Sequence, residues 1–235
     1  MKKQLLAAAI AAFTVSGVAV AHEAGDVILR LGVAHVSPEV NSGRIKTAAT
    51  GKLGDSKVSD VESNTQLGLT ATWIVAPHLG VEILAATPFT HDIKVKGVDS
   101  ALNDLGLTGT TIDGKFGKAK HLPPTVSAQY FFLDPKSKFQ PYVGLGLNYT
   151  IFLDASLSRK AKDNGFDGLD LENSWGWAAQ LGADVAITDK LFLNAAVWKI
   201  DINTTATSHN AIAGKTKVNV EIDPWVVFLG LGWKF

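Results

Sequence analysis

The last eleven residues, Trp225–Phe235, read WVVFLGLGWKF and decide the class of fold. Successive side chains of a strand point to opposite sides, so this stretch presents one uniformly apolar face: Val227, Leu229, Leu231, Trp233 and Phe235. A strand with such a face needs an apolar environment on that side. Either the core of a soluble protein or the hydrocarbon of a membrane would provide it.

The same alternation recurs along the chain and predicts eight strands, at 26–36, 64–76, 80–95, 121–133, 141–153, 174–187, 191–204 and 216–235. Short turns at 77–79, 134–138 and 188–190 alternate with long polar connections at 37–63, 96–120, 154–173 and 205–215. Weak helical signals fall in two long connections, at 98–105 and 157–161. This asymmetry is typical of up-and-down membrane barrels, which have short turns at one end and long loops at the other.

The strand faces favour lipid over a soluble core. Strand 141–153 alternates between a face of Val143, Leu145, Leu147, Tyr149, Ile151 and Leu153 and a face of small or polar residues. Charges lie mainly in the loops, and several aromatic residues fall near strand ends, as interfacial girdles do: Trp73, Tyr130, Phe132, Trp177 and Trp233. We therefore predict an all-β fold, an eight-stranded antiparallel up-and-down transmembrane β-barrel. The terminal Phe235 resembles the signal that barrel assembly machinery reads in outer-membrane proteins.

The N-terminus has the pattern of a bacterial secretory signal. Lys2 and Lys3 precede an apolar run, and Ala19-Val20-Ala21 resembles a cleavage site. We expect residues 1–21 to be a signal peptide and 22–235 to form the barrel domain. Its removal changes the formal charge from 22 − 22 = 0 to 20 − 22 = −2. A nearly neutral chain with three arginines argues against nucleic-acid binding. The chain has no cysteine, so it has no thiolate ligand for a metal.

Several motifs are similar to those of the OmpW family of small outer-membrane proteins. They are Asn64–Thr70, Gly80–Phe89, His121–Thr125 (HLPPT), Pro141–Thr150, Ser174–Gly176, Ile222–Trp225 and the HEAG of His22–Gly25. The stretch Trp198–Asp201 departs from the family, in which an aromatic residue commonly follows the tryptophan. The resemblance implies a bacterial outer-membrane location, with lipid and lipopolysaccharide as surroundings, and a monomeric channel for small hydrophobic molecules. The alternative is a structural or surface-interaction barrel that acts through its long loops.

Strand parity predicts which side chains face the lumen. An eight-stranded barrel holds side chains or one small ligand. Arg30, Glu82 and Asp184 should form a charge-paired plug in the lower half, because buried charges need partners. The apolar lumen residues, mostly higher on their strands, are Leu84, Phe152, Trp198, Ile200 and Phe228. By resemblance, Leu84 and Trp198 narrow the interior below an apolar cavity. This set forms either a binding funnel or simple packing.

Lys199 breaks the pattern of its strand, because parity places it outside. Either it snorkels to the interface or a bulge shifts the register.

The sequence predicts no catalytic, metal or cofactor site. His91 and His121 fall near the outer ends of neighbouring strands and could approach each other, but no spacing typical of metal ligands surrounds them. Ser127 and His121 lie on one strand, roughly 20 Å apart when extended, too far for a nucleophile and its base. We therefore expect that the protein is not an enzyme.

Three prolines converge on the seam between predicted strands three and four. Each proline inside a closed barrel removes a ladder donor, and strand heights place Pro88, Pro123 and Pro124 near the outer edge of the bilayer. We hypothesise a lateral opening there, through which an apolar molecule leaves the lumen for the outer leaflet. The alternative is that the prolines end strand pairing where water can bond the free carbonyls.

Overall fold

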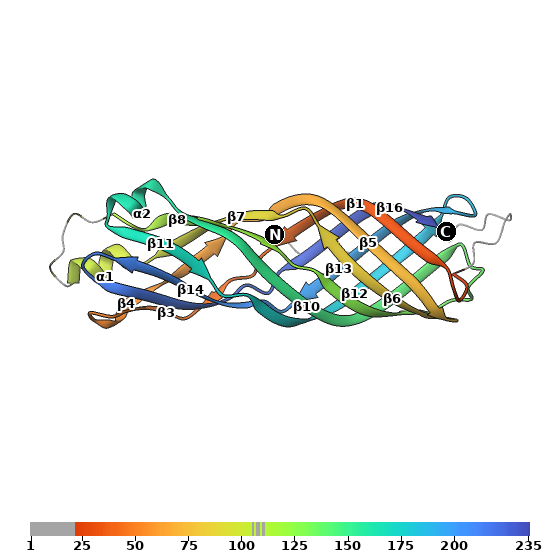
Figure 1. The fold of residues 1–235 in the computed structure, drawn as a ribbon, viewed down its shortest axis with the longest axis horizontal. Coiled ribbons are helices and arrows are strands. Elements are labelled where there is room, and N and C mark those ends of the chain that lie inside the picture. The colour runs from red at the N-terminus through yellow and green to blue at the C-terminus, as the bar shows by residue number, and fades with distance from the viewer. Residues whose placement is uncertain (1–21, 105, 107–108, 110) are drawn as a thin grey trace, which may run out of the picture.

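The computed structural model describes residues 22–104, 106, 109 and 111–235. Eight antiparallel strands close into a ring in the order β10-β12-β13-β16-β1-β5-β6-β9 and back to β10, so the predicted eight-stranded barrel is confirmed. These strands are β1 (Val27–Ser37), β5 (Asn64–Ala76), β6 (Leu79–Ala86), β9 (Thr125–Phe131), β10 (Phe139–Leu157), β12 (Ser174–Ala186), β13 (Leu191–Ile200) and β16 (Trp225–Lys234). Figure 1 shows them crossing obliquely around a long axis.

A second set of strands extends the wall beyond the long-loop end of the ring. It comprises β2 (Asn41–Ser42), β3 (Arg44–Thr47), β4 (Gly51–Val61), β7 (Phe89–Lys96), β8 (Gly114–Leu122), β11 (Phe166–Leu171), β14 (Asn203–Asn210) and β15 (Gly214–Glu221). Their pairing runs from β11 through β14, β15, β3, β4, β7 and β8 to the upper part of β10. Two short helices, α1 (Val98–Asp104) and α2 (Arg159–Asp163), lie at this far end (Figure 1). No helix of the described residues is long and apolar enough to cross a membrane.

The outer surface of the ring is apolar, because alternate side chains of every strand point outward. Leu145 and Leu147 on β10 are 71% and 64% exposed. Exposing a leucine side chain to water is unfavourable, so an outer face of this kind is suited to lipid. Aromatic side chains border this band, as expected for interfacial girdles. Near the short turns are Trp73, Tyr130, Phe132 and Trp233, and towards the other end are Trp175, Trp177 and Trp225.

Four predicted strands are split, and most of the predicted long loops contain strands. The segment 80–95 is β6 and β7, 121–133 is part of β8 with β9, 191–204 spans β13 and the start of β14, and 216–235 is β15 and β16. The expectation of long connections without strands at 37–63, 96–120, 154–173 and 205–215 was wrong because β2, β3, β4, most of β8, β11 and most of β14 lie there. These strands project past the membrane band, where the outer face can carry charges such as Lys94 and Lys118.

Lys199 lies outside without any shift of register. The β12–β13 ladder runs unbroken through Ala179 opposite Lys199, so the bulge was the wrong alternative. The ammonium donates to Glu39 Oε2 at 2.5 Å and to the Asp223 carbonyl at 2.6 Å. Its hydrogen bond and charge lower the pKa of the Glu39 carboxyl below the ordinary value. The lysine is therefore held at the long-loop edge of the band by a carboxylate and a carbonyl.

Candidate functional site: a plugged lumen with an apolar upper cavity

Arg30 is the centre of a buried charged cluster in the short-turn half of the barrel, which we call the plug. Its guanidinium donates to Asp184 from Nε (3.0 Å to Oδ1) and from Nη2 (2.6 Å to Oδ2). Nη1 donates to Thr72 Oγ1 at 2.7 Å and to Glu82 Oε2 at 3.2 Å. The three charged residues are at most 1% exposed. Two-point pairing of arginine with a carboxylate is among the strongest hydrogen-bonded arrangements. The structure thus brings together the three residues expected in the plug.

Neutral side chains complete the plug. Asn194 Nδ2 donates to Asp184 Oδ1 at 2.8 Å and to the Tyr142 hydroxyl at 3.0 Å. Gln180 Nε2 donates to Glu82 Oε1 at 2.9 Å. Every carboxylate oxygen of the plug therefore has at least one partner, as buried charges require. The network connects strands on opposite sides of the ring and closes the lumen at this level.

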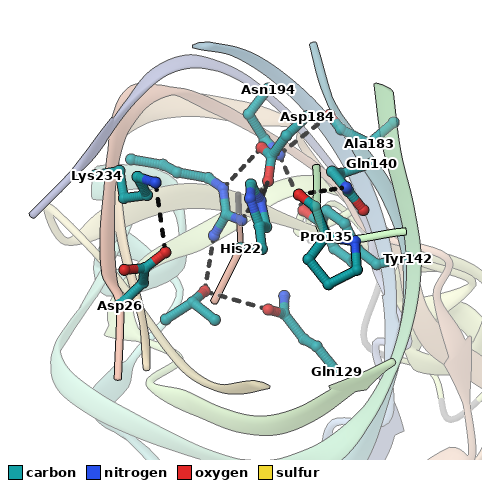
Figure 2. Close-up of polar contacts among 12 residues, drawn as sticks. His22, Asp26, Gln129, Pro135, Gln140, Tyr142, Ala183, Asp184, Asn194 and Lys234 are labelled. Carbon is teal, nitrogen blue, oxygen red and sulfur yellow. Dashed lines mark hydrogen bonds and ion pairs between the residues drawn. The ribbon is translucent and has the colours of Figure 1, made fainter. Parts of the chain in front are cut away.

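His22 joins the plug from the N-terminal side, and the sequence analysis missed it. Its ring Nε2 lies 3.1 Å from Asp184 Oδ2, and its backbone N–H donates to the Pro135 carbonyl at 3.0 Å. The ring packs against Phe131 with 5.0 Å between centroids. Figure 2 shows His22 and Asp184 side by side in this network. A histidine at the first position after the expected cleavage site was the available signal. The expected signal peptide itself, residues 1–21, lies outside the described residues.

An apolar layer lies above the plug, and we call it the floor. Leu84, Trp198, Ile200 and Phe228 belong to one buried cluster, each at most 5% exposed. The rings of Trp198 and Phe228 meet almost perpendicularly, with centroids 6.2 Å apart. These four side chains, for which the sequence left open a binding funnel or simple packing, pack in one cluster and fill the lumen at this level. The fifth, Phe152, lies higher and is only partly buried.

The lumen opens above the floor into a cavity of about 430 Å³, which we call the upper cavity. Its walls come mainly from β3, β4, β7, β14, β15 and α1, and they are mostly apolar. The volume lies within the range typical of small-molecule sites. Between this cavity and the floor is a narrower space of about 40 Å³, the neck. Val58, Ile93 and Ala206 line both spaces, so the two are adjacent.

The prolines border an interruption of the barrel wall, which we call the seam. The β6–β9 ladder ends with Leu84 opposite Thr125, and the β7–β8 ladder begins with Phe89 opposite His121. Residues 85–88 and 122–124, which include Pro88, Pro123 and Pro124, form no ladder pair with each other.

The carbonyls of the paired prolines are bonded towards β10. Tyr149 N–H donates to the Pro124 carbonyl at 3.0 Å, and Asn148 Nδ2 lies 3.2 Å from the carbonyl oxygens of both Pro123 and Pro124. At the seam, residues 122–124 are therefore hydrogen-bonded to β10, and they form no ladder pair with β6 or β7.

The inward parity reverses at the seam. Leu84 on β6 faces the lumen, yet after Thr87 and Pro88 the inward residues of β7 are the odd-numbered Phe89 and His91. As a result Phe89, His91 and His121 stack on the inner side of the wall, with 5.0 Å between the two histidine ring centroids, and the two histidines line the neck. Within the described ranges, no three side chains gather in a way that could hold a metal ion.

These features define an outer-membrane β-barrel. The closed ring removes every strand edge, the outward face is an apolar band with aromatic borders, and the connections are short at one end and long at the other. The short-turn end is then periplasmic and the long-loop end external.

Comparison with known proteins specifies the class. The sequence profile of the OmpW family matches residues 23–235. Outer membrane protein W of Vibrio cholerae is 41% identical over 235 residues, all of both chains, and that of Escherichia coli K12 is 40% identical, also over all of both. The crystal structure of the outer membrane protein OprG from Pseudomonas aeruginosa superposes with a TM-score of 0.83 at 42% identity, covering 92% of this chain and 99% of that one. The chain belongs to the OmpW family, and its place is the bacterial outer membrane.

Proposed function

We propose that the protein is a non-enzymatic, monomeric outer-membrane channel for small hydrophobic molecules, which enter at the external end and leave through the seam into the outer leaflet. The observation that carries this proposal is the division of the lumen. The external half holds a largely apolar cavity, and the periplasmic half is closed by the floor and the plug. A solute that reaches the neck has a packed layer of Trp198 and Phe228 below it and the seam beside it.

The chemistry of the path supports an apolar cargo. Transferring a hydrocarbon from water into the upper cavity is favourable in proportion to the apolar area removed from water. A charged or strongly polar solute would lose hydration in the neck, where most of the lining side chains are apolar. Small outer-membrane barrels insert through assembly machinery, and we propose that Phe235, at the end of the apolar face of β16, is the residue that it reads.

A test of entry uses vesicles with a lipopolysaccharide outer leaflet and an apolar dye, N-phenyl-1-naphthylamine, whose emission rises in phospholipid. We expect the protein to accelerate dye uptake and Ala206→Trp, which fills the boundary of cavity and neck, to abolish the acceleration. Thr205→Trp on the same strand, opposite the exposed Asn219, is the matched control. Uptake no faster than in empty vesicles would refute the channel.

A test of the exit replaces the seam prolines. Pro123→Val with Pro124→Val restores two backbone donors, which should extend pairing across the seam and slow dye uptake without unfolding the barrel. Pro141→Val is the matched control, because Pro141 lies on β10 near the short-turn end of the ring, away from the seam, and its carbonyl already accepts from Phe132 N–H at 3.1 Å. Normal uptake by the double variant would contradict the lateral route.

One observation favours a surface-interaction role as a second candidate. Lys46 on β3 lies opposite both Lys52 on β4 and Lys217 on β15, and all three are exposed at the external end. Like charges directly opposite one another destabilise a sheet, so an anionic surface such as lipopolysaccharide phosphate would relieve the repulsion. Under this role, Lys46→Glu with Lys217→Glu would abolish binding to lipopolysaccharide while Ala206→Trp would not.

A further inference from the structure

The neck is apolar except at four side chains, and two of these are already engaged. Thr150 Oγ1 donates to Asn148 Oδ1 at 2.7 Å, and Thr204 Oγ1 donates to the Glu172 carbonyl at 2.7 Å. The other two are His91 and His121, which are 3% and 7% exposed. Each threonine hydroxyl has thus used its only hydrogen, and the buried polar atoms of the neck that have no partner in the described structure belong to these two imidazoles.

The contacts of His91 fix its tautomer. Nδ1 lies 2.5 Å from the carbonyl oxygen of Glu62. A carbonyl can only accept, so Nδ1 must carry the hydrogen, and in a neutral imidazole the other nitrogen is then a bare acceptor. That atom, Nε2, is buried and has no hydrogen-bond partner in the described structure. The Nε2 atom of His91 thus has a lone pair that accepts no hydrogen bond from the described residues.

His121 has a matching unpaired atom. Its Nδ1 is buried and without a partner in the part of the chain that the structure describes. Its ring is held by stacking on Phe89 at 5.8 Å and on His91 at 5.0 Å, with Phe152 also 5.8 Å away. A neutral imidazole has one donor and one acceptor nitrogen, so His121 can supply the N–H that His91 cannot.

Both rings belong to β7 and β8, outside the membrane-spanning ring, and both are neutral near pH 7. Burial lowers the pKa of His91, and burial together with the neighbouring imidazole lowers the pKa of His121 to about 3. His121 also forms the first ladder pair beyond the seam, opposite Phe89. The unpaired nitrogens therefore lie where the neck meets the proposed exit.

We propose that the neck binds the hydroxyl end of apolar molecules with a single hydroxyl group, such as aliphatic alcohols and phenols, while their hydrocarbon part lies in the adjacent upper cavity. The O–H donates to His91 Nε2, and the hydroxyl oxygen accepts from the His121 ring. One oxygen can bridge two nitrogens up to about 6 Å apart, and the centroids of the two imidazole rings are 5.0 Å apart. This inference rests on the proposed channel function and names its substrate class. A hydrocarbon leaves both nitrogens unpaired, and an ether cannot donate to His91. A carboxylate binds less favourably because it loses its hydration in an apolar site.

The test uses the full chain in lipid nanodiscs with ¹⁵N-labelled histidine, and it titrates 1-octanol, methyl heptyl ether and n-octane. We expect 1-octanol to shift the His91 Nε2 resonance in the direction of hydrogen-bond acceptance and to bind about five- to tenfold more tightly than the ether. His91→Phe should remove this preference. His209→Phe, on the exposed face of β14, is the matched control and should retain it.

His91→Phe also removes the bond to Glu62, so His121→Phe is the second variant. It keeps that bond and the stacked ring, and it should reduce the preference for the alcohol while the His91 resonance still responds. Equal affinity for alcohol and ether, or an unchanged preference in both variants, would overturn the inference. The readout is binding and needs no transport. Alcohol binding without dye uptake would therefore refute the channel and support the site, and dye uptake without alcohol preference would do the reverse.

Discussion

Replacing Arg30 by methionine should destabilise the barrel more than replacing Asp184 by asparagine. Arg30→Met leaves the carboxylates of Asp184 and Glu82 buried without a cation. Removing one partner of a buried ion pair costs about 3–5 kcal/mol, and here one guanidinium serves two carboxylates, so we expect a loss of about 4 kcal/mol or more. Asp184→Asn leaves Arg30 paired with Glu82 and weakens charge-assisted hydrogen bonds, for a loss of about 2 kcal/mol.

The measurement is equilibrium unfolding in urea of the barrel in lipid vesicles, followed by tryptophan emission. The signal is suitable because Trp73 and Trp233 are 57% and 50% exposed on the outer face of the ring and change environment when the barrel leaves the lipid. Lys94→Met is the matched control. It makes the same chemical change in a surface pair with Asp60 and Glu62, where the cost is about 0.2–1 kcal/mol.

An uncharged plug separates the effect of charge from that of packing. In the triple variant Arg30→Met, Glu82→Gln and Asp184→Asn, no buried charge is left uncompensated, and replacing a complete buried ion pair by neutral groups is often tolerated. We expect the triple variant to recover at least half of the stability lost in Arg30→Met. If it is as unstable as Arg30→Met, or if Asp184→Asn costs as much as Arg30→Met, the electrostatic explanation is wrong.

Lowering the pH should reduce the free energy of unfolding, because two buried neutral histidines line the neck. His91 and His121 are the only titratable side chains among the described residues that line it. Because the folded-state pKa of His121 is lowered to about 3, its stabilisation is complete above the unfolded pKa of about 6.5 and is lost as the pH falls below it. Urea unfolding at about pH 5 should show a loss on the order of 2 kcal/mol relative to about pH 7, and His121→Phe should lose most of this dependence. A flat profile for the wild-type chain would contradict the burial of a neutral ring. Gly182→Ala should destabilise by about 1–3 kcal/mol, because the new Cβ would lie 2.5 Å from the Tyr142 ring and hydroxyl. Gly43→Ala, whose nearest neighbour would be 3.6 Å away, should be neutral in the same measurement.

Much of the membrane-spanning ring could be predicted from the sequence because lipid imposes a strict period of two. The predicted 64–76 coincides with β5, and 174–187 exceeds β12 by one residue. Parity likewise placed Arg30, Glu82 and Asp184 inside, and a buried arginine requires acidic partners. Beyond the bilayer that constraint disappears. Segments such as 51–61 alternate weakly and carry charges outside, so β4 was read as a loop.

The missed parts of the site depend on distant contacts. His22 has no local pattern that shows its bond to Asp184, which is 162 positions away. The sequence could not decide whether the floor residues line an open lumen or pack together. Alternation shows that Trp198 points inward, but it does not show which side chains occupy the space that Trp198 faces. The inward position of His91, and with it the stacking on His121, depends on the parity reversal at Thr87 and Pro88, which no alternating pattern contains.

The plug has a consequence for how the barrel forms. Its charges come from β1, β6 and β12: only β5 lies between β1 and β6 in the ring, whereas β13 and β16 lie between β12 and β1. A partly inserted sheet that holds β12 without β1 would leave the buried carboxylate of Asp184 without its guanidinium, at a cost of several kcal/mol. Such intermediates are therefore disfavoured relative to the closed ring. The ion pair between Arg30 and Asp184, which helps to close the lumen, thus also favours completion of the ring during insertion.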